Sequence, residues 1–140
     1  MGITLAYFRM SAPSILVVDD QPVNVQLLKR KLEREGIRVN AAFSGAEALE
    51  FVRSERPDLI LLDVMMPDMD GLEVCARLQA NEATRGIPII FITAFRTSEN
   101  RRRASQMAAD GFLAKPISHH DFASQITAAL QQPARRLWAA

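Results

Sequence analysis

Four short apolar runs in this sequence end on polar side chains suited to binding a metal ion or a phosphoryl group. The runs end on the pair Asp19-Asp20, on Asp63, on Thr93 and on Lys115. Carboxylates that lie close together raise one another's pKa, and a hard divalent cation relieves their repulsion. Mg²⁺ prefers oxygen ligands and is usually held by one or two carboxylates together with water. A hydroxyl and an ammonium beside such an ion provide the electrostatic setting that phosphoryl transfer needs.

The apolar runs have the length of buried β-strands, and each is followed by a stretch with helical periodicity. We expect strands at 14–19, 38–43, 58–63, 87–93 and 111–115. The expected helices lie at 22–35, from 44 onward, from 70 onward, at 97–109 and from 118 to about 130. Strict alternation of strands and helices predicts a parallel sheet covered on both faces. We therefore predict an α/β fold, a flavodoxin-like (βα)5 three-layer sandwich whose five-stranded parallel sheet has the order 2-1-3-4-5.

The predicted strand order determines where the polar residues meet. It places the first and third strands side by side, and ligands bind in the crevice at the carboxyl ends of such strands. Asp19, Asp20 and Asp63 then converge at one edge of the sheet. Asp63 is the best candidate for a nucleophile that carries an aspartyl phosphate, because it stands alone at the end of the central strand. The formal charges of the three carboxylates, the Lys115 ammonium and one Mg²⁺ add up to zero.

Four segments together resemble a known family. They are Ile-Leu-Val-Val-Asp-Asp at 15–20, Asp-Val-Met-Met-Pro-Asp-Met-Asp-Gly at 63–71, Thr93-Ala94 and Lys115-Pro116. This set, with its spacing, resembles the receiver domain of two-component response regulators, the CheY-like family. Each segment alone would be a weak signal, whereas the joint pattern is specific. The resemblance covers residues 14–131, nearly the whole chain.

The resemblance implies a phosphorylation site. Asp63 would accept a phosphoryl group from a histidine kinase or a phosphotransfer protein. Mg²⁺ would be bound by Asp20, Asp63 and the backbone carbonyl of Met65, with Asp19 acting largely through water. Thr93 and Lys115 would contact the phosphoryl oxygens. The Lys115–Pro116 peptide bond would be cis.

The resemblance also implies a switch. Phe112 matches the position of the family's aromatic switch residue, and Thr93 matches the switch threonine. It is phenylalanine rather than tyrosine here, so it would act by packing and not through a hydroxyl group. Phosphorylation would change the binding of a downstream protein effector, or of a second copy in a homodimer, through the fourth helix, fifth strand and fifth helix. Met65 and Phe95 would flank the path of the water that hydrolyses the phosphate.

Several of these residues also have simpler interpretations. Asp19-Asp20 taken alone is equally compatible with capping the first helix, and the other three positions favour the metal role. Phe112 also fits a core position without a switching role. The Arg101-Arg102-Arg103 run fits either a solvated helix face or a docking patch. We expect His119 and His120 to be solvated surface residues. Leu137-Trp138 lies in a tail that is either disordered or packed on a partner.

Length, charge and composition are those of one soluble domain. The chain has 140 residues, a formal net charge of +1 and 49% hydrophobic residues. Such a charge gives no indication of nucleic-acid binding or of attraction to a membrane surface. No apolar stretch approaches the ~20 residues of a membrane span, and we expect a cytoplasmic protein. The single cysteine, Cys75, excludes an internal disulfide and is expected to be a buried, inert thiol.

Residues 1–13 are interpreted as an N-terminal extension, with either Met1 or Met10 as the true start, and residues 132–140 as a tail or the start of a linker. Two alternatives to an independent signalling receiver stay open. The first is the same receiver cut from a longer protein such as a diguanylate cyclase, a transcription factor or a hybrid kinase. The second is a phosphatase of the haloacid dehalogenase type. That class needs a second acid two residues after the nucleophile, where this chain has Met65. We therefore expect a protein that catalyses only its own phosphorylation and dephosphorylation.

Overall fold

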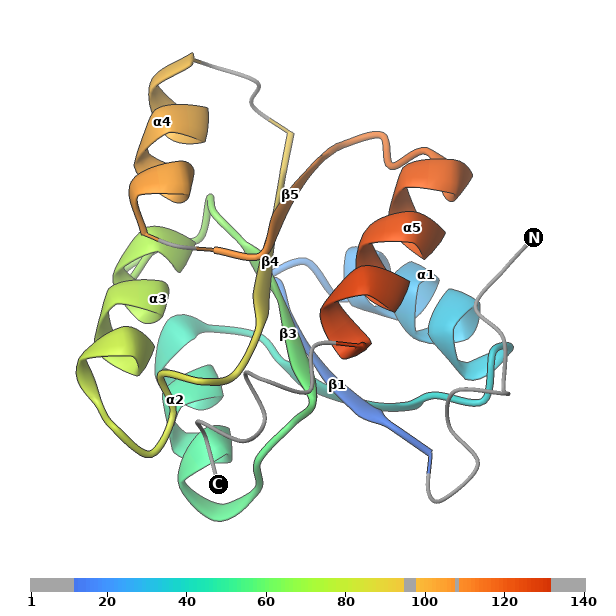
Figure 1. Cartoon of the computed structure of the whole chain (residues 1–140), viewed down its shortest axis with the longest axis horizontal. Coiled ribbons are helices and arrows are strands. Elements are labelled where there is room, and N and C mark those ends of the chain that lie inside the picture. Colours follow the sequence, from blue (N-terminus) through green and yellow to red (C-terminus); the bar gives the residue numbers. More distant parts are fainter. Residues whose placement is uncertain (1–11, 95–97, 108, 132–140) are drawn as a thin grey trace.

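The computed structural model describes residues 12–94, 98–107 and 109–131, and in them strands and helices alternate (Figure 1). The strands are β1 (Ser14–Val18), β2 (Arg38–Ala42), β3 (Leu59–Asp63), β4 (Ile89–Thr93) and β5 (Gly111–Ala114). The helices are α1 (Pro22–Glu33), α2 (Gly45–Ser54), α3 (Gly71–Ala80), α4 (Ser98–Gln106) and α5 (His119–Leu130). Each expected strand and helix is present.

The strands form one parallel sheet with the order β2-β1-β3-β4-β5. The predicted flavodoxin-like topology is therefore confirmed. The register pairs Val18 with Leu62, so the residues that follow β1 and end β3 are neighbours. Asp63 pairs in turn with Ile92 of β4. The polar ends of the strands thus meet at one edge of the sheet.

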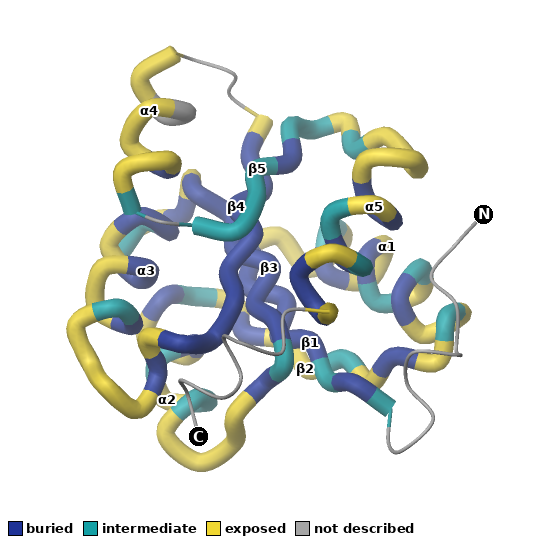
Figure 2. The backbone as a smooth tube through the Cα atoms, viewed as in Figure 1, coloured by how far each residue is buried: buried dark blue, intermediate teal, exposed yellow. Residues whose placement is uncertain are grey.

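Alternating side chains of the buried strands form two apolar clusters, one on each face. One cluster joins Ile15, Leu61 and Ile92 of the strands to residues of α1 and α5. The other joins Leu16, Leu62 and other strand residues to α2, α3 and Ala104 of α4. Figure 2 shows β3 and β4 buried along their length, whereas α4 is largely exposed. Because every residue of β3 and β4 is buried, these strands give the site a rigid base.

The starts of α2 and α3 are capped by side chains close to them in the sequence. In α2 the Glu47 N–H donates to Ser44 Oγ at 3.1 Å, and Glu47 Oε1 accepts from the Phe43 N–H at 2.9 Å. In α3 the Glu73 N–H donates to Asp70 Oδ1 at 2.9 Å. The Glu73 side chain pairs with Arg77 rather than completing a capping box. These bonds fix the first turns of two helices that follow β2 and β3.

Three expected boundaries are wrong by two or more residues. Helix α1 ends at Glu33 rather than 35. The fourth strand begins at Ile89 rather than 87, because the Ile87 N–H closes a turn onto the Thr84 carbonyl at 3.0 Å and Pro88 has no N–H to donate. Helix α4 ends at Gln106 rather than 109, because the Met107 N–H bonds the Ala104 carbonyl in a tighter turn. All three differences lie away from the polar edge of the sheet.

Several simpler expectations can be compared directly. Cys75 is buried, and His119 and His120 are exposed, as expected. Arg102 and Arg103 are exposed on α4, which fits either interpretation of the arginine run. Among the described residues, none of the helices combines the length and the apolar character needed to cross a membrane. The N-terminal extension up to 11, Phe95 and the 132–140 tail lie outside the described residues.

Candidate functional site

Three carboxylates lie together at the carboxyl edge of the sheet. Asp63 ends β3, Asp19 directly follows β1, and Asp20 is its neighbour. One oxygen from each lies within 4.8 Å of the others. Asp19 is 2% exposed and Asp63 is 5% exposed, while Asp20 is half-buried. The strand register therefore brings together the carboxylates that the sequence predicted would converge.

Lys115 joins this cluster from the end of β5. Its Nζ lies 3.1 Å from Asp19 Oδ2 and 3.9 Å from Asp63 Oδ1. The Lys115–Pro116 peptide bond is cis, as expected. Thr93 ends β4, beside β3, and is completely buried. The ammonium and the hydroxyl thus come from the two strands that follow β3 in the sheet.

Asp63 has an unusual protonation equilibrium. Burial of its carboxyl group, followed by repulsion from Asp19, raises its pKa to about 6. The charge of Lys115 and a hydrogen bond from the Met65 N–H to Asp63 Oδ1, at 3.4 Å, oppose this rise. At neutral pH the carboxylate form still predominates. Asp63 is therefore a buried anion with too little positive charge around it to cancel the effects of burial and of Asp19.

Asp19 is not a conventional helix cap. Its Oδ1 accepts a hydrogen bond from the backbone N–H of Gln21 at 2.9 Å. Gln21 is itself the N-cap residue of α1, and its side chain makes no capping bond. The other oxygen of Asp19 faces Lys115. This arrangement holds the Asp19 carboxylate at the site instead of over the first turn of the helix.

The segment after β3 is folded closely against the site. The Gly71 N–H donates to the Val64 carbonyl at 2.9 Å, and Asp68 has a φ of 69° in the turn between them. A Cβ at position 71 would lie 2.2 Å from the backbone oxygen of Asp63. Only glycine allows the start of α3 to approach this strand end so closely. Met65 lies in this segment with half of its surface exposed.

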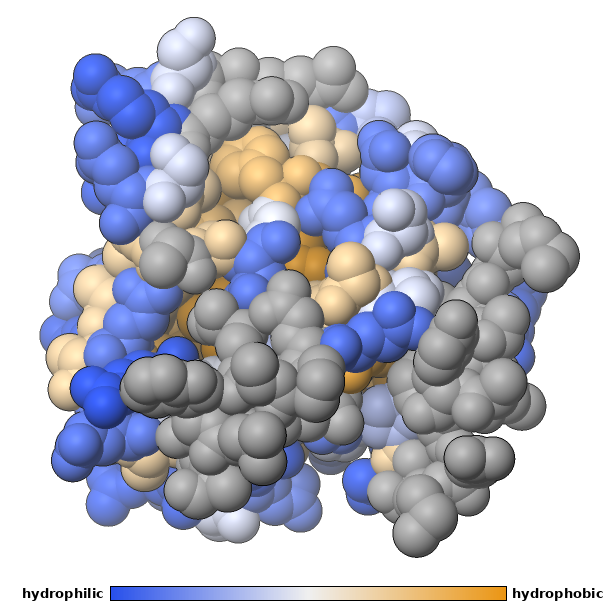
Figure 3. Space-filling view, viewed as in Figure 1, coloured by the Kyte–Doolittle hydropathy of each residue, from blue (hydrophilic) through white to orange (hydrophobic). Residues whose placement is uncertain are grey.

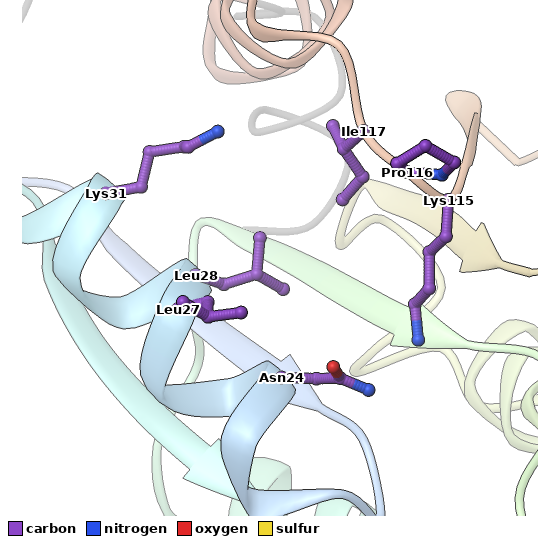
Figure 4. A pocket seen from close by; sticks show the side chains of 7 residues that line it. All are labelled: Asn24, Leu27, Leu28, Lys31, Lys115, Pro116 and Ile117. Atoms are coloured by element: carbon purple, nitrogen blue, oxygen red, sulfur yellow. The ribbon is translucent and has the colours of Figure 1, made fainter.

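A pocket of 310 Å³ lies beside the site, between α1 and the chain that follows β5 (Figure 4). It is lined by Asn24, Leu27, Leu28, Lys31, Lys115, Pro116 and Ile117. Leu27 and Leu28 project from α1 toward the segment that begins at Lys115 (Figure 4). The Lys31 ammonium lies 5.1 Å from the centre of the Phe122 ring. The sequence analysis did not identify this pocket, because its two walls are far apart in the sequence.

The donor set fits a hard divalent cation. All three carboxylates offer oxygen atoms, which Mg²⁺ prefers. Among the described residues, Lys115 is the one cationic side chain that forms ion pairs with Asp19 and Asp63. A single ammonium leaves the cluster with net negative charge. The described residues thus provide the oxygen ligands for such an ion and an electrostatic reason to bind it.

A match to a family model of the response regulator receiver domain covers residues 15–127, most of the chain. The chain belongs to this family. Receiver domains are signalling modules rather than enzymes that turn over free substrates. The motifs at the sheet edge therefore belong to a family in which phosphoryl acceptance is the common chemistry.

Two curated relatives illustrate the range of this family. The chain is 47% identical over 103 residues to the response regulator PleD of Caulobacter vibrioides, covering 74% of this chain and 23% of PleD. It is 37% identical over 105 residues to the polar-differentiation response regulator DivK of Brucella abortus, covering 75% of this chain and 85% of DivK. The chain thus spans less than a quarter of one relative and most of the other.

Solved structures support the same assignment. A CheY-like receiver domain protein from Methanospirillum hungatei matches with a TM-score of 0.82 and 28% identity, covering 90% of this chain and 99% of that one. The receiver domain of Francisella response regulator 1452 matches with a TM-score of 0.79 and 30% identity, covering 86% of this chain and 98% of that one. The described fold is therefore that of a receiver domain.

Proposed function

We propose that Asp63 accepts a phosphoryl group from a phosphohistidine of a histidine kinase or a phosphotransfer protein, in a reaction that depends on Mg²⁺. The observation that carries the proposal is the placement of Asp63. Its nearly buried carboxylate ends the central strand, faces the Lys115 ammonium at 3.9 Å and lies among two further carboxylates. An oxygen nucleophile, a cation and a set of metal ligands in one place are what phosphoryl transfer to a carboxylate requires.

In this reaction the bond between phosphorus and the histidine nitrogen breaks as a bond to an Asp63 oxygen forms. The freed imidazole leaves and takes up a proton from the solvent. Lys115 is poised to pair with a phosphoryl oxygen, because its ammonium already lies between two carboxylates. The Thr93 hydroxyl donates a hydrogen bond to a second oxygen. These contacts stabilise charge that develops on the transferring group.

Mg²⁺ would be held by Asp20, Asp63 and the backbone carbonyl of Met65, with Asp19 acting largely through water. When bound, the ion offsets the repulsion among the carboxylates and the charge of the phosphoryl oxygens. Asp19 keeps its Oδ1 on the Gln21 N–H, so its orientation is fixed before an ion arrives. The chain thus supplies prearranged oxygen ligands.

The surface around the site supports a protein donor. Among the described residues, the exposed large hydrophobic side chains are Val23, Leu27, Phe43 and Met65, with exposed fractions from 42% to 64%. Phe43 directly follows β2, Met65 follows β3, and the other two lie on α1 after β1. Exposed apolar side chains gathered around one site are typical of protein contacts. A phosphohistidine presented on a protein surface would reach Asp63 through this apolar rim.

The proposed output surface consists of α4, β5 and α5, and β5 is an edge strand of the sheet. Apolar surface gathers between α4 and α5, around β5 (Figure 3). A hollow of 240 Å³ there is lined by Ala104, Ser105, Ala109, Asp110, Gly111 and Phe112. Phe112 is half-buried and packs on the cluster that includes Phe91 and Ala104. We propose that phosphorylation repacks Phe112 and changes binding of a protein effector or a second copy at α4, β5 and α5.

The proposal concerns receiver chemistry in the cytoplasm. The same site would serve an independent receiver or one that belongs to a longer protein with an output domain. It involves neither direct nucleic-acid binding by this domain nor a membrane. The phosphatase alternative has less support, because Met65 occupies the position where that class needs a second acid.

The first test is labelling with acetyl phosphate in the presence of Mg²⁺, followed by intact mass measurement. We expect one added phosphoryl group in the parent and none in Asp63→Asn. Asp68→Asn is the matched control, because Asp68 is an exposed aspartate in the loop after the same strand. Labelling of Asp63→Asn at the parent rate would show that another residue is the acceptor.

The second test concerns the protein donor. Leu27→Asn makes the apolar rim more polar without adding a charge to the pocket that Leu27 and Lys115 both line. We expect it to slow transfer from a phosphorylated phosphotransfer protein by about tenfold and to leave labelling by acetyl phosphate unchanged. Arg30→Asn, at another exposed position of α1, is the control. If transfer from the phosphotransfer protein and labelling by acetyl phosphate were slowed equally, the defect would lie in the phosphorylation site rather than in the contact with the protein donor.

A further inference from the structure

The side chain of Gln125 is bound to the backbone of the edge strand β5. Its Oε1 accepts a hydrogen bond from the Phe112 N–H at 3.1 Å. Its Nε2 donates to the Phe112 carbonyl at 3.2 Å. Both halves of the amide are therefore used on a single residue, and the reversed amide would bring donor against donor and acceptor against acceptor. We call this pair of hydrogen bonds the Gln125 clamp.

Gly111 makes room for the clamp. A Cβ at position 111 would lie 2.1 Å from Gln125 Oε1. A side chain of any size there would displace the amide from Phe112. The amide comes from the middle of α5 and reaches a strand that has β4 on its other side. Gly111 and Gln125 thus form a matched pair across the space between β5 and α5.

The clamp lies on the strand that connects the phosphorylation site with the proposed output surface. Lys115 follows the end of β5 and contacts Asp19 and Asp63 through its ammonium. Phe112 lies three residues earlier and packs on the apolar cluster that includes Ala104 of α4. A movement of Lys115 toward a phosphoryl group would act on the same strand that Gln125 holds.

We propose that Gln125 is a positioning residue that couples α5 to β5, so that a displacement of β5 on phosphorylation of Asp63 is passed to α5 through the backbone of Phe112. The inference rests on the proposed function and goes beyond it by assigning the connection to one side chain. The ring of Phe112 would pass the displacement to α4, and the backbone of Phe112 would pass it to α5 through the clamp. Two hydrogen bonds to one residue allow little sliding of the strand against the helix, because a shift along the strand breaks both.

The test compares backbone amide NMR shifts with and without beryllofluoride and Mg²⁺, which stand in for the phosphoryl group and its ion. Gln125→Met removes both hydrogen bonds at similar volume, and Gly111→Ala disturbs the clamp from the strand side. Ser124→Ala, at an exposed neighbour on α5, is the control. In both clamp variants the amides of Asp63 and Lys115 should shift as in the parent. The shifts of α5 amides such as Ile126 should fall to less than about half.

Amide hydrogen exchange at Phe112 tests the clamp without any phosphoryl group. Exchange of this N–H should be about tenfold faster in Gln125→Met than in the parent or in Ser124→Ala. If Gln125→Met does not fold, Gln125→Glu carries the comparison of amide shifts, because its carboxylate lacks the donor that the Phe112 carbonyl needs. Gly111→Ala then carries the exchange comparison, because its Cβ would displace the oxygen that accepts from the Phe112 N–H.

The outcomes separate the two proposals. Parent-like shifts in α5 for both clamp variants would overturn the coupling, and so would unchanged exchange at Phe112. A parent protein whose Asp63 and Lys115 amides do not respond to beryllofluoride would overturn the proposed phosphorylation instead. In that case faster exchange in Gln125→Met would still show that the clamp forms. The clamp would then have no role in a response to phosphorylation.

Discussion

Replacement of Asp63 by asparagine should stabilise the metal-free protein, although Asp63 is the residue on which the proposed function depends. Burial and the neighbouring Asp19 raise the pKa of Asp63 to about 6, against about 3.9 for an aspartate in an unfolded chain. Each unit of difference corresponds to about 1.4 kcal/mol, so the ionised carboxylate costs the fold about 3 kcal/mol above pH 6. Asparagine has nearly the same shape and carries no charge.

The sign of the pH dependence follows from proton binding. Between about pH 4 and 6 the folded protein holds a proton on Asp63 that the unfolded chain has lost, so the free energy of unfolding falls as pH rises. Asp63→Asn has no carboxylate at this position, so its free energy of unfolding does not fall for this reason. The variant should therefore be about 2–3 kcal/mol more stable than the parent at pH 8, and the difference should shrink to about 0.5 kcal/mol at pH 4. The hydrogen bond from the Met65 N–H can still be accepted by the asparagine oxygen, so it adds little to the difference.

Urea unfolding followed by far-ultraviolet circular dichroism, with a chelator present, measures both free energies. The control is Asp68→Asn, since Asp68 is exposed and its φ of 69° is one that asparagine adopts readily. We expect the control to differ from the parent by less than about 0.5 kcal/mol at either pH. If Asp63→Asn is no more stable than the parent at pH 8, or is stabilised equally at both pH values, the ionised Asp63 carboxylate does not destabilise the fold.

Three further predictions follow from the same region. Millimolar Mg²⁺ should stabilise the parent by about 1.4 kcal/mol at ten times its Kd and Asp63→Asn by less, as measured by thermal unfolding; an unchanged melting temperature in the parent would argue against the metal site. Gly71→Ala should cost at least about 2 kcal/mol in urea unfolding, because its Cβ would lie 2.2 Å from a backbone oxygen, whereas Gly45→Ala should cost less because its nearest obstacle is the Val74 side chain. Met65→Asn should speed loss of phosphate from the purified protein about tenfold by orienting the attacking water, with Met65→Leu as the control, and equal rates would show that this side chain does not govern the lifetime.

The sheet and its polar edge could be predicted because both depend on local sequence. Each buried strand is a short apolar run, and strict alternation with helices leaves few possible topologies. Once the strand order is known, Asp19 and Asp63 must be neighbours, because β1 and β3 pair in register. The hydrogen bond between Ser44 and Glu47 is of the same local kind, since the two residues are three apart in the sequence.

Other features depend on contacts between distant segments and could not be read. Gln125 gives no local signal, because a glutamine in the middle of an amphipathic helix is ordinary. Its partner Phe112 lies thirteen residues away on another element. The need for glycine at position 71 comes from the backbone of Asp63, which the chain approaches only after folding. The extent of the shift in the pKa of Asp63 also required the burial that the complete sheet provides.

The electrostatic cost at Asp63 and the organisation of the sheet are connected. Two apolar clusters hold β1 and β3 from both faces, so the fold can keep Asp19 and Asp63 together despite their repulsion. A site assembled at such a cost gains more from any added positive charge than a neutral site would. Lys115 provides part of that charge from β5, the edge strand, which has a paired strand on one side only. In the proposed switch, a change in charge at Asp63 would act through Lys115 on an edge strand, and Gln125 of α5 holds that strand by two hydrogen bonds to Phe112.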